Sequence, residues 1–455
     1  MKKFLIAGLA AIIAGCGGGG SNTSAPTATI SSTSNTTTNS CTNPHTSTYP
    51  TEYNGIWPTP SVTQQLDKQI LRSVGFKDYS PPVNSRLYST SCPGEQYAKL
   101  MYTITLDRLK ELGVDTVWMY NYGSWTVTDK NSVWTMDPNN MQISFSLMQF
   151  ILQEAQKRNI KVYLAWQFHN LDTNNNQVIP NDIATPELMR KAMIAHRKNI
   201  VELAKFGEQY GLAGIAADYN AWNVVNFYDD TIAEIFISET STTIDELRKV
   251  FSGKITLGQM HLPWNDARTF DKIDAIHISA WIRISENERL NFSSDVVRDA
   301  FSKQIYEAYM AVNCYGAHAG TQKCLKQKST KEVPVIFEFS PQSRDKYWTE
   351  GWVEDGFCVN GKLPNGTSHN CIQQTYKTDF SVQAVGTHGL FQAATQQKYF
   401  KVFAINFHSS YWHTDTLVPS GYDSQSYMGE GFPNLSQSIR GKPAETVVKQ
   451  WFKRT

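Results

Sequence analysis

The chain has 455 residues, of which 41% are hydrophobic, and it carries a formal net charge of +1. It is therefore long enough to bury a large core, and its near-neutral charge argues against nucleic acid as a partner. Aromatic residues make up 12% of the chain. This content fits a large core as well as a sugar-binding surface, so composition alone leaves the function open.

The first residues have the pattern of a segment that directs export. Met1-Lys2-Lys3 is basic, and the apolar run 4–14 is too short to span a bilayer, as in a secretory signal peptide. The run ends in Ile13-Ala14-Gly15-Cys16, which resembles the lipobox of bacterial lipoproteins, where the chain is cut before the Cys and the thiol is acylated. We therefore expect residues 1–16 to be a lipoprotein signal peptide and Cys16 to carry the lipid. An ordinary signal peptide is the alternative.

The same resemblance gives an expected location. Residue 17 is Gly rather than Asp, so the inner-membrane retention signal of some lipoproteins is missing, and we expect a lipid anchor in the outer membrane of the cell envelope. Residues 17–55 are rich in Gly, Ser, Thr and Asn and bury too little apolar surface to offset the entropy lost on folding. We expect them to form a disordered tether that precedes a folded domain at 56–455.

The cysteine content suggests disulfide bonds. Seven cysteines leave six once Cys16 is set aside, and an even number in an exported chain favours bridges. Sequence neighbours are the expected pairs, namely Cys314 with Cys324, Cys358 with Cys371, and Cys41 with Cys92. The connectivity stays open because six cysteines allow fifteen pairings. A zinc cluster is disfavoured by the absence of a C-x-x-C motif.

From residue 71 onward, short apolar runs alternate with stretches of helical period. The expected strands cover 71–76, 114–120, 160–166, 212–217, 255–260, 273–280, 333–339 and 400–407, and the expected helices cover 96–112, 145–158, 186–210, 295–312 and 380–397. Eight strands alternating with helices over about 340 residues predict an α/β fold, a closed (β/α)8 or TIM barrel. A doubly wound open sheet is the alternative. The turn after the first strand lacks a glycine-rich phosphate loop, which favours the barrel and argues against a nucleotide.

In a TIM barrel, the functional site lies at the carboxyl ends of the strands. Here these ends carry aromatic rings that suit the faces of a sugar, and amides and imidazoles that suit its hydroxyls. The predicted sugar contacts are Tyr120, Tyr122, Trp125, Trp166, His169, Asn220, Trp222, Gln259, His261, Trp281, His408 and Trp412, and His277 and Asn406 lie at strand ends too. The histidines invite a metal interpretation, but the first strand lacks paired His and no H-E-x-x-H occurs. We therefore expect no metal and no cofactor.

Two carboxylates also stand at strand ends. Asp218 follows the fourth predicted strand, and Glu338 ends the apolar run 333–337 of the seventh, where burial opposes the charged form unless a partner stabilises it. Hydrolysis of a glycosidic bond needs one protonated carboxyl to assist the leaving oxygen and one ionised carboxylate to attack or stabilise the sugar cation. We therefore predict Asp218 and Glu338 as a catalytic pair.

On the segment 335–339, the region of Trp412 and the closing segment 438–444, the chain resembles the clan A retaining glycoside hydrolases, and most closely family 113 and related barrels. The resemblance implies that the nucleophile ends strand seven, at Glu338, and that the acid/base ends strand four, at Asp218. That clan has Glu at strand four, and Asp218 is one methylene shorter. A second assignment therefore stays open, in which Asp218 attacks and Glu338 or Glu286 donates the proton.

The sequence thus predicts an exported, lipid-anchored glycoside hydrolase that acts as a monomer on a polysaccharide or oligosaccharide. Two alternatives remain, a non-catalytic carbohydrate-binding lipoprotein on the same scaffold and a metal-dependent extracellular deacetylase. The sugar, its linkage, and endo or exo action depend on loop shape, which the sequence leaves open.

Overall fold

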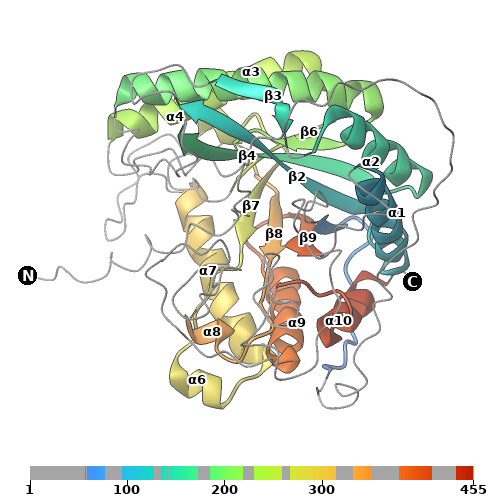
Figure 1. Cartoon of the computed structure of the whole chain (residues 1–455). Helices are drawn as coiled ribbons and strands as arrows, with labels where there is room; N and C mark the ends of the chain where they lie inside the picture. Colours follow the sequence, from blue (N-terminus) through green and yellow to red (C-terminus); the bar gives the residue numbers. More distant parts are fainter. Residues whose placement is uncertain are drawn as a thin grey trace, which may run out of the picture.

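The fold is a barrel of strands surrounded by helices, seen in a computed structural model of the chain (Figure 1). The structure describes residues 57, 59–76, 95–127, 135–141, 143–172, 185–218, 230–258, 267–313, 331–350, 379–411 and 437–453.

The barrel consists of eight parallel strands. They are β1 (Leu71–Phe76), β2 (Thr116–Val127), β4 (Lys161–Asp172), β5 (Gly214–Ala216), β6 (Lys254–Leu257), β7 (Ala275–Ser279), β8 (Val335–Phe339) and β9 (Val402–Tyr411). Each strand pairs in parallel with the next, and β1 closes the ring by pairing with both β2 and β9. The predicted TIM barrel is confirmed, and each of its eight predicted strands is present.

A further strand, β3 (Thr135–Met141), was not predicted and pairs antiparallel with β2. One edge of β2 pairs along its whole length with β4. Two strands share the other edge of β2. Strand β1 pairs with its residues Thr116–Met119, and β3 pairs with it between Gly123 and Thr126. Strands β2 and β4 therefore continue past the closed barrel at their carboxyl ends, and with β3 they form a three-stranded extension there.

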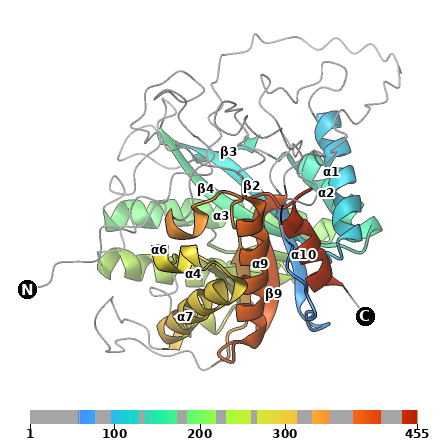
Figure 2. The ribbon, with the colours of Figure 1, turned by 90° about the horizontal axis from the view of Figure 1, so that it is seen from below.

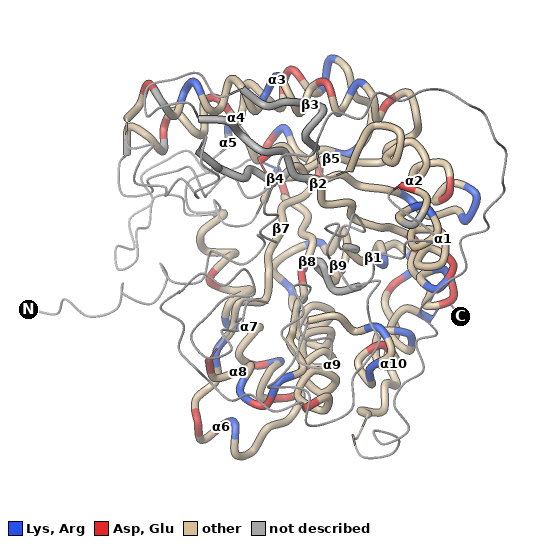
Figure 3. The backbone as a smooth tube through the Cα atoms, in the orientation of Figure 1, with Lys and Arg blue, Asp and Glu red and all other residues tan. Residues whose placement is uncertain are grey.

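Helices surround the barrel on its outside (Figure 2). They are α1 (Glu95–Glu111), α2 (Phe145–Lys157), α3 (Pro186–Tyr210), α4 (Asp230–Val250), α5 (Ala267–Phe270), α6 (Glu286–Leu290), α7 (Ser294–Asn313), α8 (Tyr347–Glu350), α9 (Phe380–Gln396) and α10 (Pro443–Phe452). Figure 3 shows basic and acidic residues interspersed along helices such as α1, α3 and α6. None of the helices in the described ranges is long and apolar enough to cross a membrane.

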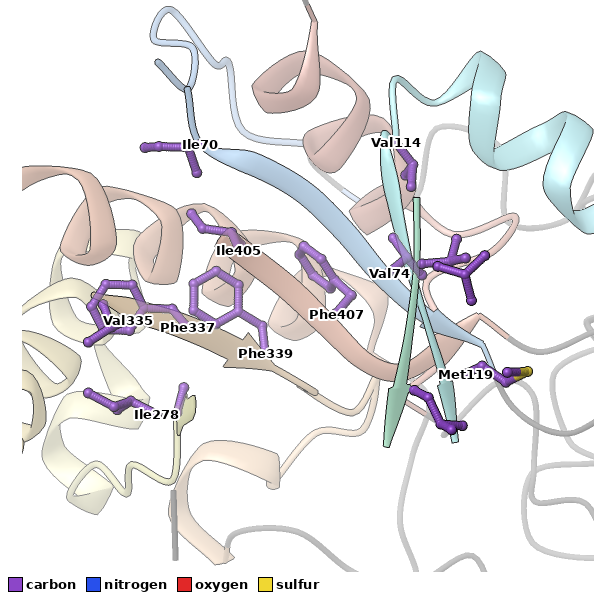
Figure 4. Packing of buried hydrophobic residues seen from close by; sticks show 14 of the residues in the cluster. Ile70, Val74, Val114, Met119, Ile278, Val335, Phe337, Phe339, Ile405 and Phe407 are labelled. Atoms are coloured by element: carbon purple, nitrogen blue, oxygen red, sulfur yellow. The ribbon is translucent and has the colours of Figure 1, made fainter. Parts of the chain in front are cut away.

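The alternation of side chains along each strand separates two cores. Outward-facing residues such as Val335, Phe337 and Phe339 of β8 pack with Ile405 and Phe407 of β9 in the layer between strands and helices (Figure 4). The inward-facing residues form a second cluster, made of Trp118, Tyr120, Tyr163, Ala165, Ala216, Ala275, Ile336 and Ala404. Since successive residues of a strand point to opposite faces, Glu338 points into the barrel, above Ile336.

Candidate active site

Glu338 lies near the carboxyl end of β8 and is only 2% exposed. Three side chains from the two neighbouring strands contact its carboxylate. Ser279 Oγ donates to Oε2 over 3.0 Å, Asn406 Nδ2 donates to Oε1 over 3.1 Å, and His277 Nδ1 lies 2.8 Å from Oε1. Hydrogen-bond donors aimed at a buried carboxylate stabilise its ionised form.

The partners of Glu338 are themselves held by other strands. Asn406 Nδ2 also donates to the Tyr120 hydroxyl over 3.1 Å, and Asn406 Oδ1 accepts from Ser73 Oγ over 3.0 Å. On the other side, Thr256 Oγ1 lies 3.0 Å from His277 Nε2. This buried network takes side chains from β1, β2, β6, β7, β8 and β9, so the closed barrel fixes the position of Glu338.

Aromatic rings fill the barrel beneath this network. The centroid of the Trp118 ring lies 4.7 Å from that of the His277 ring, at an interplanar angle of 75°. It lies 5.0 Å from the centroid of the Tyr163 ring. Edge-to-face contacts of this kind pack rings tightly in cores. Below the polar layer, the floor of the site is therefore formed by closely packed rings.

Asp218 is fully buried directly after β5. Its Oδ1 accepts a hydrogen bond from the backbone N–H of Gly258 over 2.5 Å, whereas its Oδ2 has no hydrogen-bond partner among the described residues. Burial raises the pKa of Asp218 to about 7, with the N–H of Gly258 acting in the opposite direction. At neutral pH a large fraction of Asp218 therefore carries a proton that it can donate.

The two carboxyl groups belong to strands β5 and β8, which are separated in the barrel by β6 and β7. Both stand at the carboxyl ends of their strands, where TIM barrels hold their chemistry. Their surroundings differ, because burial favours protonated Asp218 while polar donors favour ionised Glu338. Two carboxyls whose environments differ in this way can serve as acid and base.

Trp281 is the predicted sugar contact whose side chain the structure shows at the surface. It follows β7 and is 45% exposed. Gln304 on α7 holds this segment at two points, since its Oε1 accepts from the Trp281 N–H over 3.0 Å and its Nε2 donates to the Ser279 carbonyl over 2.8 Å. An exposed indole on a backbone segment held in this way is suited to stacking against a sugar ring.

Two other predicted contacts need correction. The ring of Trp166 is fully buried in the layer between strands and helices, because it shares the outward face of β4 with Val162 and Leu164. It has no surface to offer to a ligand in this structure. Tyr120 is 1% exposed and accepts a hydrogen bond from Asn406, so it supports the network under the site instead of forming its rim.

The alternative acid Glu286 lies on α6 with a side chain that is 65% exposed and paired with Arg289 Nε at 2.6 Å. It lies on a helix outside the barrel and not at the carboxyl end of a strand, unlike Asp218 and Glu338.

Several predicted residues remain untested by the geometry. For Tyr122 and Trp125 in β2, His169 in β4 and His408 in β9, the structure describes the backbone alone. The residues outside the described ranges are Asn220, Trp222, Gln259, His261, Trp412, Cys16, Cys41, Cys92, Cys314, Cys324, Cys358 and Cys371. Their roles stay predictions.

Sequence reasoning missed three members of the network, namely Ser73, Thr256 and Ser279. Ser and Thr are ordinary strand residues, so composition gives no signal for them. The period-two pattern does give one, because these inward residues alternate with outward apolar residues such as Val74, Ile255 and Ile278 in β1, β6 and β7.

Two further findings concern binding sites. The described residues include no group of three or more His, Cys, Asp or Glu side chains that could hold a metal ion. A cavity of about 870 Å³ lies at the opposite end of the barrel, between the turn after α1, Asn159 and α10. It contains none of the residues predicted for the site.

The comparison with solved structures identifies the architecture. One match is a GH113 β-1,4-mannanase, with 14% identity over 85% of this chain and 98% of that chain and a TM-score of 0.51. The chain shares the barrel fold of that enzyme. A GH113 β-mannanase from Alicyclobacillus acidocaldarius matches with 15% identity over 84% of this chain and 96% of that chain, at a TM-score of 0.48. No protein-family model and no curated protein matches the chain.

Proposed function

We propose that this protein is a glycoside hydrolase that acts on a polysaccharide or oligosaccharide. The observation that supports this best is the pair of buried carboxyl groups at one end of the barrel. The surroundings of Asp218 favour its protonated form and those of Glu338 favour its ionised form. The barrel fold shared with a GH113 β-1,4-mannanase is consistent with this chemistry.

In the proposed mechanism, Glu338 is the nucleophile and Asp218 the acid/base. The Glu338 carboxylate attacks the anomeric carbon while the bond to the leaving oxygen breaks, and that oxygen takes the proton of Asp218. Asp218, now ionised, takes a proton from a water whose oxygen attacks the same carbon. The sugar is released with retained configuration, and Glu338 is again a carboxylate.

The reverse assignment, with Asp218 as nucleophile, is less compatible with the surroundings of the two groups. A nucleophile must rest in its ionised form, yet burial favours protonated Asp218, whose Oδ2 lacks a partner among the described residues. Glu338 has donors on both of its oxygens.

We further propose that the enzyme is exported and lipid-anchored in the outer membrane. The sequence pattern of residues 1–16 supports cleavage before Cys16, and the composition of 17–55 supports a tether to the domain at 56–455. The expected disulfide pairs and a monomeric state belong to the same proposal. A tethered hydrolase would remain at the envelope while reaching extended polymers.

A non-catalytic carbohydrate-binding protein is the second candidate, because Asp218 is shorter than the Glu expected at strand four. To distinguish the two, purified protein and its Glu338→Gln variant would be incubated with β-mannans, β-glucans, galactans and bacterial exopolysaccharides, and new reducing ends measured. Cleavage by the wild type alone is expected. Binding without cleavage of every polymer would support the second candidate. Full activity after metal removal would exclude the metal-dependent deacetylase.

A further inference from the structure

His277 is a buried histidine whose two ring nitrogens are both occupied. The residue is fully buried, with Nδ1 at 2.8 Å from Glu338 Oε1 and Nε2 at 3.0 Å from Thr256 Oγ1. A carboxylate can only accept, so an ionised Glu338 requires the proton on Nδ1. The Thr256 hydroxyl, which can donate or accept, then donates to Nε2, so the carboxylate sets the tautomer and Thr256 holds the other side of the ring.

The packing leaves the imidazole little freedom to turn. From within the barrel, the ring of Trp118 packs edge-on against the imidazole of His277, with an interplanar angle of 75° and 4.7 Å between the ring centroids. In the strand register, His277 pairs with Ile336, so its ring reaches diagonally to Glu338 two residues further along β8. Thr256 holds the opposite side of the ring from β6. Contacts from β2, β6 and β8 therefore determine where Nδ1 of His277 points.

Strand β6 and the residue that follows it, Gly258, support both carboxyl groups. Thr256 holds His277, which contacts Glu338, and two residues later the N–H of Gly258 donates to Asp218. A shift of β6 would therefore move the supports of both groups together.

We propose that His277, oriented by Thr256, is a positioning residue for Glu338 and assists its departure from the sugar. This inference rests on the proposed function. An N–H donor binds a carboxylate more strongly than the neutral ester that Glu338 forms with the sugar. As water breaks the bond between the sugar and Glu338, negative charge returns to the carboxylate. The Nδ1–H of His277 stabilises that charge, so its loss slows the second step more than the first.

The test compares two pairs of variants on 2,4-dinitrophenyl glycosides, which need little help from the acid in the first step. His277→Leu removes both contacts, whereas His277→Asn keeps an N–H near the position of Nδ1. Thr256→Val removes the hydroxyl at nearly constant shape, whereas Thr256→Ser keeps it. Thr243→Val is the matched control, because Thr243 is equally buried but donates within α4 to the Glu239 carbonyl.

For His277→Leu and Thr256→Val we expect kcat to fall roughly 10- to 100-fold, the size of one hydrogen bond to a charged group. KM should fall with it because the glycosyl-enzyme accumulates, and intact-mass measurement in the steady state should show the added sugar. His277→Asn and Thr256→Ser should recover much of kcat, and Thr243→Val should match the wild type. A purely structural role would lower the folded fraction without lowering KM.

Unchanged kcat and KM in folded His277→Leu and Thr256→Val would overturn the proposal, as would equal losses in His277→Leu and His277→Asn. If the wild type cleaves no glycoside and no polymer, the proposed function fails and this inference fails with it. If the variants do not fold, ¹⁵N NMR of the wild-type histidine rings provides a second test. Protonated Nδ1 and bare Nε2 at His277 are expected, and the opposite tautomer would overturn the proposal.

Discussion

Asp218 and Glu338 are both shielded from solvent, yet Asp218 Oδ1 accepts from the backbone N–H of Gly258 while three polar side chains contact the carboxylate of Glu338. In both cases burial opposes the charge, and within the described ranges it is Glu338 that has side-chain donors to offset this effect. The proton of the pair is therefore expected on Asp218.

The first prediction concerns the roles of the two carboxyl groups. Glu338→Ala should lose roughly 10⁴-fold or more in kcat, because no other group can form the covalent intermediate. Asp218→Ala should harm substrates with poor leaving groups most, since an activated aryl glycoside leaves with little protonation. The measurement is kcat/KM for both variants on a series of aryl glycosides.

Azide provides the control for this assignment. It should accelerate Asp218→Ala on an activated glycoside and give a glycosyl azide of retained configuration, by attacking an intermediate that Glu338 still forms. If Asp218→Ala instead gave an azide of inverted configuration, and Glu338→Ala were rescued with retention, Asp218 would be the nucleophile.

The second prediction concerns the pH dependence of activity. A general acid works only when protonated, and burial raises the pKa of Asp218 to about 7. We therefore expect kcat/KM on a substrate with a poor leaving group to fall as pH rises through about 7. Asp218→Asn, measured on an activated aryl glycoside, should lack this decline. If the decline of kcat/KM persisted unchanged in the variant, a group other than Asp218 would cause it.

The third prediction concerns the pH dependence of stability. Burial raises the pKa of Asp218 from 3.8 to about 7. The contribution of this group to the free energy of unfolding is therefore complete below pH 3.8 and is lost as pH rises through about 7. His196 is fully buried with Nε2 2.7 Å from the Ala217 carbonyl, and burial lowers its pKa from 6.5 to about 4. The contribution of His196 to the free energy of unfolding is therefore complete above pH 6.5 and is lost as pH falls through about 4. The two pH dependences oppose each other, by roughly 4 kcal/mol for Asp218 and roughly 3 kcal/mol for His196.

Single variants should reveal these opposing slopes. Relative to the wild type, Asp218→Asn should gain free energy of unfolding at pH 8 and lose that gain toward pH 4. His196→Gln keeps a donor for the Ala217 carbonyl and should gain at pH 4 instead. Urea unfolding at pH 4.5, 6 and 8 measures both effects. Parallel profiles for all three proteins would contradict the prediction.

The fourth prediction separates two tryptophans. Trp281 is 45% exposed after β7, so Trp281→Ala should raise KM for an oligosaccharide several-fold and leave the melting temperature within a few degrees. Trp166 is fully buried, and Trp166→Ala should cost about 3–5 kcal/mol of unfolding free energy. Thermal unfolding and initial rates on the same preparations distinguish the two. An unchanged KM for Trp281→Ala would exclude it from the substrate site.

The fifth prediction concerns the anchor. Cys16→Ala should no longer be labelled by a radioactive or clickable fatty acid and should leave the membrane fraction. The wild-type protein, labelled in parallel, is the control. Persistent labelling of the variant would defeat the lipobox assignment.

The sequence predicted the barrel well because each parallel strand is buried on both faces and is therefore a short apolar run between polar turns. Helix α4 was missed, since its sequence contains several Ser and Thr residues of low helix propensity. Strand β3 was missed because it contains Pro138 and two Asn, which argue against a strand. They are tolerated because β3 is an edge strand that pairs with β2 on one side.

The candidate site was predictable where the residue type is itself unusual. A carboxylate such as Glu338 after an apolar run is detectable in one dimension. The network members Ser73, Thr256 and Ser279 show in the sequence only as polar residues in a period-two pattern, and the closed barrel is needed to show that they face the same interior. Trp166 was assigned to the site because it ends a predicted strand. Alternation with Tyr163 and Ala165, which point inward, explains its outward direction.

The hydrogen bond between Ser73 and Asn406 joins residues 333 positions apart in the chain. It links the first barrel strand to the last, so the surroundings of Glu338 are incomplete until nearly the entire polypeptide has been synthesised and both ends of the sheet have met. Closing so long a loop is entropically costly and slow. A nascent or truncated chain that lacks β9 would therefore have Glu338 without its Asn406 donor, and hydrolytic competence would appear only with ring closure, as the last event of folding.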